Sequence, residues 1–350
     1  MGKMKQPFFV TALLLLLFSI PAVFSLLRSG FYEPHDLHHF ADIYQTYRAF
    51  ESGQIPPRLG PDFTFGYGYP LFNFYYVLPF YLGAFWFSLF GSLMASFKLV
   101  FILSALISVF GMYLFLREIF GKWPAFFGSL LYLYTPYRAV EIYVRGAIGE
   151  ALALSVLPFV AWAIIKVIKN PKPATIATFS LLLALFLLSH NYLWLLSAPW
   201  LALFALGFVT LSKTKLTVIK NLIFATILGL GISFYWWFPA LVEQGLVASI
   251  TPFRIEDHFP FVRQLIFSSW GYGSSVPGPG DGMSFQIGIV NLAVVGGVLG
   301  ILLFARRFLI EKMVLLVTSW AFLGFFSSVF LMNISSLFIW KILTFYQFIQ

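Results

Sequence analysis

Long apolar runs separated by short polar stretches dominate this chain. A helix of about 20 apolar residues crosses the roughly 30 Å hydrocarbon core of a bilayer. The pattern therefore predicts an all-α, polytopic transmembrane bundle of about ten spans, built as one transmembrane domain over residues 1–350. The runs that we expect to cross lie at residues 7–27, 97–116, 123–136, 151–168, 173–189, 192–211, 221–239, 285–305, 313–332 and 337–350.

Composition supports this fold class. Hydrophobic residues make up 60% of the chain and charged residues 10%, and the mean hydropathy is +0.88. A soluble domain carries about 25% charged residues, so a lipid bilayer must be the solvent for much of this chain. The formal charge of +9 comes from short basic clusters between apolar runs, which is typical of cytoplasmic loops and not of a nucleic-acid-binding surface. Without cysteine there is no disulfide, thiolate zinc site or cysteine nucleophile.

The two ends of the chain are also apolar. The first run follows Lys3 and Lys5 and resembles a signal peptide, but it is long for one and no small-residue cleavage site follows, so we interpret it as a first span. The chain stops at Gln350 inside an apolar run, and we expect a truncated C-terminus.

The run at residues 70–91 is ambiguous, because Pro70 and Pro79 interrupt it. If it does not cross, 13 of the 22 basic residues lie inside with two acidic residues, giving the inner side +11 and the outer side −2. If it crosses, most of the basic residues move outside. The positive-inside rule favours the first arrangement. We therefore expect a multi-pass plasma-membrane protein with a cytoplasmic N-terminus, an interfacial 70–91 helix, and outer segments 28–96, 137–150 and 240–284.

The first outer segment begins with an amphipathic helix. Pro34 suits a first turn, and Gly53 with two prolines ends the pattern. Asp36 would then lie in the first turn, where the helix dipole stabilises a carboxylate. Asp36 is our candidate for a general base or a divalent-cation ligand, with simple helix capping as the alternative. The apolar positions at spacings of three or four are Leu37, Phe40, Tyr44 and Tyr47.

Three histidines accompany this acid. His35 and His39 are spaced i, i+4, whereas His38 faces the side of Asp42, so the histidines do not share one face. We therefore expect no dedicated metal site here, although a divalent cation stays possible as a cofactor. His35 is kept as a candidate substrate-binding residue.

A second polar group lies in TPYRAVEIYVRGAIGEALAL. Glu150 enters an apolar helix, and an acid within a membrane segment is a functional candidate by default. Glu141 and Arg145 are further candidates, with a plain i, i+4 ion pair as the alternative. Pairing of Glu150 with Arg145 or Arg138 is the structural alternative for that residue.

Two other outer features carry polar residues. His190 lies between two apolar runs and is a candidate for contacting a phosphate or sugar, although turn chemistry explains Asn191. Segment 240–284 ends in a Gly-, Pro- and Ser-rich stretch, which predicts a mobile flap or acceptor-binding lid, or a flexible linkage without function. No nucleotide-binding or metalloprotease motif is present, so nucleotide-driven chemistry is not expected. The ionisable residues of that segment are Glu243, Arg254, Glu256, Asp257, His258 and Arg263.

These blocks resemble known families. An outer loop with an acidic residue, a G-x-x-P-P-R stretch and the aromatic GYGYPLFNFYYVLPFYLG segment resemble the GT-C class of membrane glycosyltransferases. More specifically, HDLHHFADIY, GYGYPLFNFY, TPYRAVEIYVRGAIGEALAL and FYQFIQ are similar to the membrane proteins called "6-pyruvoyl-tetrahydropterin synthase-related". Nothing in the chain is similar to a soluble pterin enzyme.

The GT-C resemblance implies transfer of a sugar from a polyprenyl-phosphate donor to an acceptor on the extracytoplasmic face. Asp36 matches the catalytic acidic position of that class and Glu141 its second acidic position. Many members have paired acids in the first loop, whereas Asp36 has only Glu33 nearby, so metal dependence is in doubt. Arg145 and His190 are our candidates for the donor phosphate, which needs cationic or hydrogen-bonding groups.

Two other classes of protein fit the same pattern. A transporter or flippase for a lipid-linked or polar substrate would bury polar groups at mid-membrane in broken, repeated helices, whereas here the ionisable residues gather at the outer ends. A non-catalytic envelope assembly protein would tolerate substitution of Asp36 and Glu141.

Overall fold

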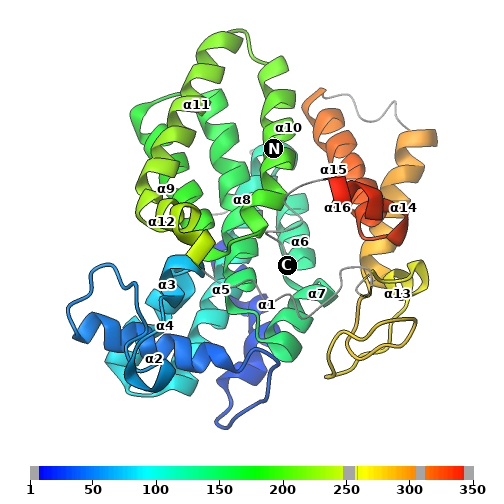
Figure 1. Cartoon of the computed structure of the whole chain (residues 1–350). Coiled ribbons are helices and arrows are strands. Elements are labelled where there is room, and N and C mark those ends of the chain that lie inside the picture. The colour runs from blue at the N-terminus through cyan, green and yellow to red at the C-terminus, as the bar shows by residue number, and fades with distance from the viewer. Residues whose placement is uncertain (1–7, 247–256, 258, 305–311, 343–350) are drawn as a thin grey trace.

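The computed structural model describes residues 8–246, 257, 259–304 and 312–342, and these residues form a helical bundle (Figure 1). No strand occurs among them, only the isolated β-bridges Gly60–Tyr69 and Tyr272–Met283. The all-α prediction is therefore confirmed. The helices are α1 (Phe8–Val23), α2 (His38–Glu51), α3 (Leu71–Phe74), α4 (Leu78–Phe90), α5 (Leu93–Phe120), α6 (Lys122–Leu133), α7 (Pro136–Val140), α8 (Ile148–Lys169), α9 (Pro173–Ser189), α10 (Leu193–Thr210), α11 (Lys215–Ile232), α12 (Phe234–Glu243), α13 (Val262–Ile266), α14 (Ile289–Phe304), α15 (Lys312–Leu331) and α16 (Leu337–Ile342).

Six helical segments in the described part of the chain are long and apolar enough to cross a membrane. Each falls on one of the ten expected spans. Of the other four, α9 and α14 are apolar but have 17 and 16 residues, α6 has 12, and α16 is described only up to Ile342. The six are Phe9–Leu27, Leu93–Phe120, Ile148–Lys169, Leu193–Thr210, Lys215–Ile232 and Val314–Leu331.

Helices α5 and α8 form the centre of the bundle and pack closely along their length. Small residues make this approach possible: a Cβ on Gly111 of α5 would lie 2.5 Å from the ring of Phe159 on α8. Buried serines bond back within their own helix, as from Ser104 Oγ to Val100 O at 2.8 Å and from Ser108 Oγ to Ala105 O at 2.7 Å, so these hydroxyls need no water. Small and self-satisfied polar residues are typical of helix contacts in membranes.

The ambiguous run at 70–91 forms two short helices, α3 and α4. Helix α4 has 13 residues, about 20 Å at 1.5 Å per residue, which is too short for a 30 Å hydrocarbon core. It packs against α2 and α5, and Gly83 lets Ile43 of α2 approach so closely that a Cβ would meet its side chain at 2.6 Å. In Figure 1, α2 and α4 lie together at the end of the bundle opposite the α10–α11 connection, and we call this the α2 end.

The expected span at 221–239 is wrong in its second half. Helix α11 ends at Ile232, and a new helix, α12, begins at Phe234. Buried Ser233 lies at the break, where its hydroxyl bonds Gly229 O at 3.0 Å. The aromatic residues of α12 thereby face α3 at the α2 end instead of extending α11.

Candidate functional site

The candidate site begins where two distant segments meet at the α2 end. The amides of His35 and Asp36 donate to the carbonyls of Val144 and Arg145 at 3.0 and 2.8 Å. These bonds hold the stretch before α2 outside the helix, which begins at His38. The expected helix start at Pro34 is therefore wrong, and Asp36 precedes the first turn.

A glycine permits this junction. Gly146 ends the π-helical turn Glu141–Arg145 with a φ of +71°, a backbone conformation that L side chains rarely adopt. A Cβ on Gly146 would also lie 2.6 Å from the Cβ of Pro34. Both the left-handed backbone and the close approach require glycine at this position.

Asp36 presents an accessible carboxylate next to a buried imidazole. Its side chain is 34% exposed, and its Oδ2 lies 4.0 Å from Nε2 of His39. The same Nε2 lies 3.3 Å from the Tyr76 hydroxyl, and Nδ1 lies 3.2 Å from Oδ2 of Asp42. Burial lowers the pKa of His39 to about 4 and raises the pKa of Asp42 to about 7. His39 is therefore a neutral imidazole between two carboxyl groups at neutral pH.

Arg145 and Glu150 form an ion pair beside Asp36. Arg145 Nη1 donates to Glu150 Oε2 at 2.5 Å and to the Tyr137 hydroxyl at 2.9 Å, and that hydroxyl donates to Glu150 Oε1. Burial would lower the pKa of Arg145, but Tyr137, Glu150 and Asp36 outweigh it and raise the pKa. Pairing with Arg145, one of the two structural alternatives for Glu150, is thus what the structure has.

Glu141 is enclosed beneath this ion pair. Its side chain is 0% exposed, neither carboxyl oxygen has a hydrogen-bond partner, and Nη1 of Arg138 lies 4.0 Å away. Burial, and then the charge of Glu150, raises the pKa of Glu141 above its ordinary value. The alternative of a plain Glu141–Arg145 ion pair is not seen, because the π-helical turn places Arg145 on Glu150.

His190 joins the site from the α9–α10 connection. Its ring stacks on Tyr76 with 5.2 Å between centroids, and its Nδ1 accepts from the amides of Tyr192 and Leu193 at 3.2 and 3.3 Å. Burial lowers the pKa of His190 to about 4. The ring is therefore neutral at pH 7 with its proton on Nε2, so it offers a hydrogen-bond donor and not a cation.

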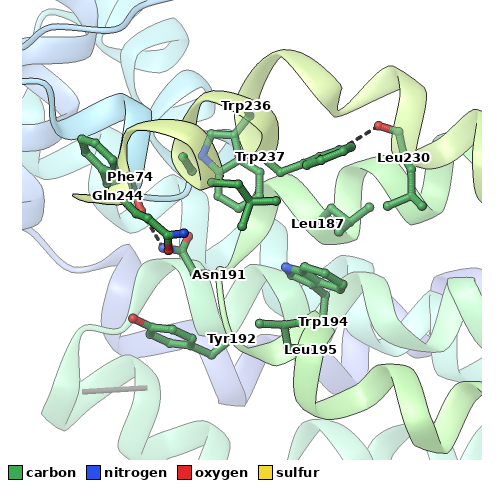
Figure 2. Close-up of a pocket in the computed structure, with 12 residues that line it drawn as sticks. Phe74, Leu187, Asn191, Tyr192, Trp194, Leu195, Leu230, Trp236, Trp237 and Gln244 are labelled. Carbon is green, nitrogen blue, oxygen red and sulfur yellow. Dashed lines mark hydrogen bonds between the residues drawn. The ribbon is translucent and has the colours of Figure 1, made fainter. Parts of the chain in front are cut away.

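An apolar cavity of about 550 Å³ opens next to His190 along the chain (Figure 2). Its walls are aromatic and aliphatic, with Asn191 and Gln244 as polar groups. Asn191 Nδ2 donates to Phe74 O at 2.7 Å, and Trp237 Nε1 to Leu230 O at 2.9 Å. Sequence reasoning missed this cavity, although the Trp pair in FYWWFPALVE was a signal for it. The other lining residues are Leu187, Tyr192, Trp194, Leu195, Trp236, Ala240 and Leu241.

The loop between α13 and α14 also reaches the site. The Asp281 carboxylate accepts from Gln264 Nε2 at 3.0 Å and from the Ser269 amide at 3.1 Å, which fixes the two arms of the loop to each other. His35 Nε2 lies 3.1 Å from the Tyr272 carbonyl oxygen. The segment expected to be a flap or lid is thus a folded loop in contact with the start of the site.

Two other ionisable residues of that segment have partners outside the Asp36 neighbourhood. Glu243 accepts from Asn73 Nδ2 at 2.9 Å, and Arg263 Nη2 donates to Pro279 O at 2.9 Å. Arg254, Glu256 and His258 lie outside the described residues.

The structure brings Asp36, Arg145 and Glu150 together, with His190 close enough to be influenced by the latter two charges. His35 lies at the edge of this group, and Glu141 lies beneath it without exposure. Sequence reasoning did not identify Tyr76 and Tyr137, since tyrosines are frequent in this chain and their positions give no signal.

Three side chains on α2 form a group that could hold a metal ion. Ligand atoms of His38, His39 and Asp42 all lie within 4.8 Å of one another. His38 faces Asp42 as expected, but His39 also reaches Asp42. The sequence predicted no metal site because the three histidines would not share one helix face. That argument holds for His35, but His38 and His39 both reach Asp42.

Comparison with known proteins places the chain in a family without naming its chemistry. Neither the curated proteins nor the solved structures contain a match. A family model described as "6-pyruvoyl-tetrahydropterin synthase related domain; membrane protein" matches residues 72–332, about three quarters of the chain. This range includes Glu141, Arg145, Glu150 and His190 but not Asp36. The chain therefore belongs to the 6-pyruvoyl-tetrahydropterin synthase-related family of membrane proteins.

Proposed function

We propose that this protein is a membrane glycosyltransferase that moves a sugar from a polyprenyl-phosphate donor to an acceptor hydroxyl at the extracytoplasmic face. One observation carries the proposal: the accessible carboxylate of Asp36 lies beside the Arg145–Glu150 pair, and His190, which stacks on Tyr76, is followed in the chain by Asn191, a lining residue of the apolar cavity. A lipid-linked sugar needs these elements together, namely a base, phosphate-binding donors and an apolar surface for its chain.

In the proposed reaction Asp36 is the general base. It takes the proton of the acceptor hydroxyl while the acceptor oxygen attacks the anomeric carbon of the sugar. The bond from that carbon to the phosphate oxygen breaks, and polyprenyl phosphate leaves with the electron pair. His39 lies beside Asp36, with its Nε2 4.0 Å from the Asp36 carboxylate.

Arg145 and His190 would bind the donor phosphate. A guanidinium has five N–H donors, and the bonds of Arg145 to Glu150 and Tyr137 both leave from Nη1. His190 offers its Nε2 proton, because Nδ1 already accepts two amides. Charge-assisted hydrogen bonds from such groups are the strong form of phosphate recognition.

The cavity would accommodate the first isoprene units of the donor. Its volume of about 550 Å³ lies within the 300–1,000 Å³ of ordinary ligand pockets. Trp194, Trp236 and Trp237 line it. Asn191, next to His190 in the chain, is one of its few polar groups, so a phosphate near His190 would have its chain directed into this apolar space.

Glu141 fits a supporting role in this proposal. It is fully buried and has no hydrogen-bond partner, so it cannot meet an acceptor hydroxyl in this conformation. We assign it to the electrostatic environment of Arg145 and Glu150, which its charge state influences.

The test compares Asp36→Asn with the wild type in transfer from polyprenyl-phosphate sugars by the purified protein in lipid nanodiscs. Loss of a general base lowers transfer by about 100-fold or more. Asp62→Asn is the matched control, since Asp62 is a half-exposed acid of the same segment that pairs with Arg48. Equal transfer by Asp36→Asn and wild type would remove Asp36 as the base.

The same experiment separates the other classes of protein. A flippase would move the labelled donor across vesicle membranes. The sugar–phosphate bond of the donor would then stay intact with the wild type and with Asp36→Asn alike. An assembly protein would neither bind nor consume a donor. Either outcome would overturn the transferase proposal.

A further inference from the structure

The first two turns of α2 carry three potential metal ligands, His38, His39 and Asp42. Oδ2 of Asp42 lies 3.2 Å from Nδ1 of His39 and 3.8 Å from Nε2 of His38. All three ligand atoms lie within 4.8 Å of one another. One carboxylate oxygen therefore faces two imidazole nitrogens at the same time.

These separations are close to those of a tetrahedral metal site. With metal–ligand bonds of about 2.0–2.1 Å, two ligand atoms of a tetrahedral zinc ion lie about 3.3–3.5 Å apart. The Asp42 distances of 3.2 and 3.8 Å bracket this range. The distances from His38 Nε2 to the other two ligand atoms must shorten for all three to reach one ion. The His38 side chain is 54% exposed, so it has room to rotate.

The charges around Asp42 favour a cation. Its side chain is 3% exposed, and in the described part of the chain its ion-pair partners are His38 and His39. A buried carboxylate is stable when it is paired or coordinates a metal, and neutral imidazoles are the protonation state that binds metals.

The surroundings of His39 match those of a metal ligand. A ligating histidine donates its second ring N–H to a carboxylate, a carbonyl or another oxygen, which fixes the ring. With Nδ1 on the ion, Nε2 of His39 carries the proton and has the Tyr76 hydroxyl at 3.3 Å and Asp36 Oδ2 at 4.0 Å. The Tyr76 hydroxyl is therefore in place as the acceptor, and Asp36 lies just beyond hydrogen-bond distance.

We propose that His38 Nε2, His39 Nδ1 and Asp42 Oδ2 bind one divalent transition-metal ion, with zinc as the ion of choice. Two imidazoles and one carboxylate suit zinc and its neighbours better than magnesium or calcium, which prefer oxygen ligands alone. Three protein ligands leave a fourth position open, on the exposed side where His38 lies. This site is separate from cation binding at Asp36, and it stands whether or not the protein transfers sugars.

The test measures metal content of the full-length protein in detergent after chelation, zinc re-addition and gel filtration. We expect one zinc per chain in the wild type, by mass spectrometry of the metal. His38→Gln removes an exposed ligand and should weaken zinc at least about 10-fold, since even outer-shell changes cost that much. Asp42→Asn should abolish retention. His35→Gln is the matched control, because His35 is a neighbouring histidine outside the group.

Cobalt replacement gives an independent readout. Tetrahedral cobalt bound by these ligands should give visible absorption in the wild type and in His35→Gln, and not in Asp42→Asn. Wild type without bound metal, equal zinc in His38→Gln and wild type, or an equal loss in His35→Gln would each overturn the proposal. The first of these results would mean that His39 and Asp42 share only a proton.

Discussion

Two groups of ionisable side chains lie close together at the α2 end and differ in access. The first, the Asp36 group, comprises Asp36, His39 and Asp42. The second, the Glu141 group, comprises Glu141 and Arg138. Asp36 is about one-third exposed, whereas Glu141 has no exposed surface and no hydrogen-bond partner.

The difference shows why we assign different roles to two acids in one neighbourhood under the proposed function. A base must reach the proton that it removes, and only the Asp36 group offers a carboxylate at the surface. Glu141 has no exposed surface, so it can influence Arg145 and Glu150 only through its protonation state. Arg145 stands between the two groups, so substitutions around it give the sharpest tests of this division.

The largest effect is expected from Arg145→Met. It leaves Glu150 without its cation, and breaking a largely buried ion pair costs about 3 kcal/mol. The loss should appear as a lower thermal unfolding midpoint in detergent. The double variant Arg145→Met/Glu150→Gln should regain much of the stability, because no unpaired charge remains. If it is as unstable as the single variant, the ion pair is not the cause.

A somewhat smaller effect is expected from Gly149→Ala. An added Cβ would overlap the ring of Tyr76, which contacts both His39 and His190. Overpacking of this kind costs about 1–3 kcal/mol. Gly91→Ala is a poor control because its φ is +64°. Gly297 of α14 has open space around it, so Gly297→Ala should not lower the unfolding midpoint and should raise it slightly through helix propensity. Equal midpoints in Gly149→Ala and wild type would contradict the close packing of Tyr76.

A pH-dependent effect distinguishes the Glu141 group. Its raised pKa means that the folded state disfavours the ionised form, so its contribution to stability is present below the unfolded pKa of 4.5 and is lost as pH rises toward neutrality. The slope is at most about 1.4 kcal/mol per pH unit for one proton. Glu141→Gln should reduce the pH dependence of the thermal unfolding midpoint between pH 5 and 8. An unchanged slope would show that Glu141 is not buried in its neutral form.

The smallest effect is expected at the other end of the bundle. Glu118 pairs with Lys166 and Lys169 at 2.9 and 3.2 Å, with both lysines partly exposed. Such pairs contribute less than about 1 kcal/mol, so Glu118→Gln should barely shift the midpoint. A shift as large as that of Arg145→Met would show that burial does not explain why the two ion pairs contribute differently to stability.

Much of the fold could be predicted because lipid imposes a simple rule on length and polarity. The expected run at 173–189 coincides with α9, and each of the six membrane-length helices falls on an expected span. The break at Ser233 could not be predicted, since residues 221–239 carry no charged side chain and α12 packs on α3, far from it in the sequence.

The site could be predicted only in part. Charge counting placed Asp36, Arg145, Glu150 and His190 on one side, and the structure brings them into one neighbourhood. Charge counting could not show that Glu141 is enclosed. The sequence suggested an i, i+4 pair with Arg145, but the π-helical turn Glu141–Arg145 is followed by a pairing of Arg145 with Glu150. The start of α2 was missed for a similar reason: long-range backbone bonds, and not local preference, keep residues 35 and 36 outside the helix.

The backbone bonds from His35 and Asp36 to Val144 and Arg145 also constrain the order of assembly during synthesis. A ribosome delivers Asp36 to the membrane more than a hundred residues before its partners exist. A nascent chain that ends before Gly146 therefore holds Asp36 without the segment that positions it. The stacking of His190 on Tyr76 adds a still later requirement. The group of side chains at the α2 end is thus completed only after α9 has been synthesised.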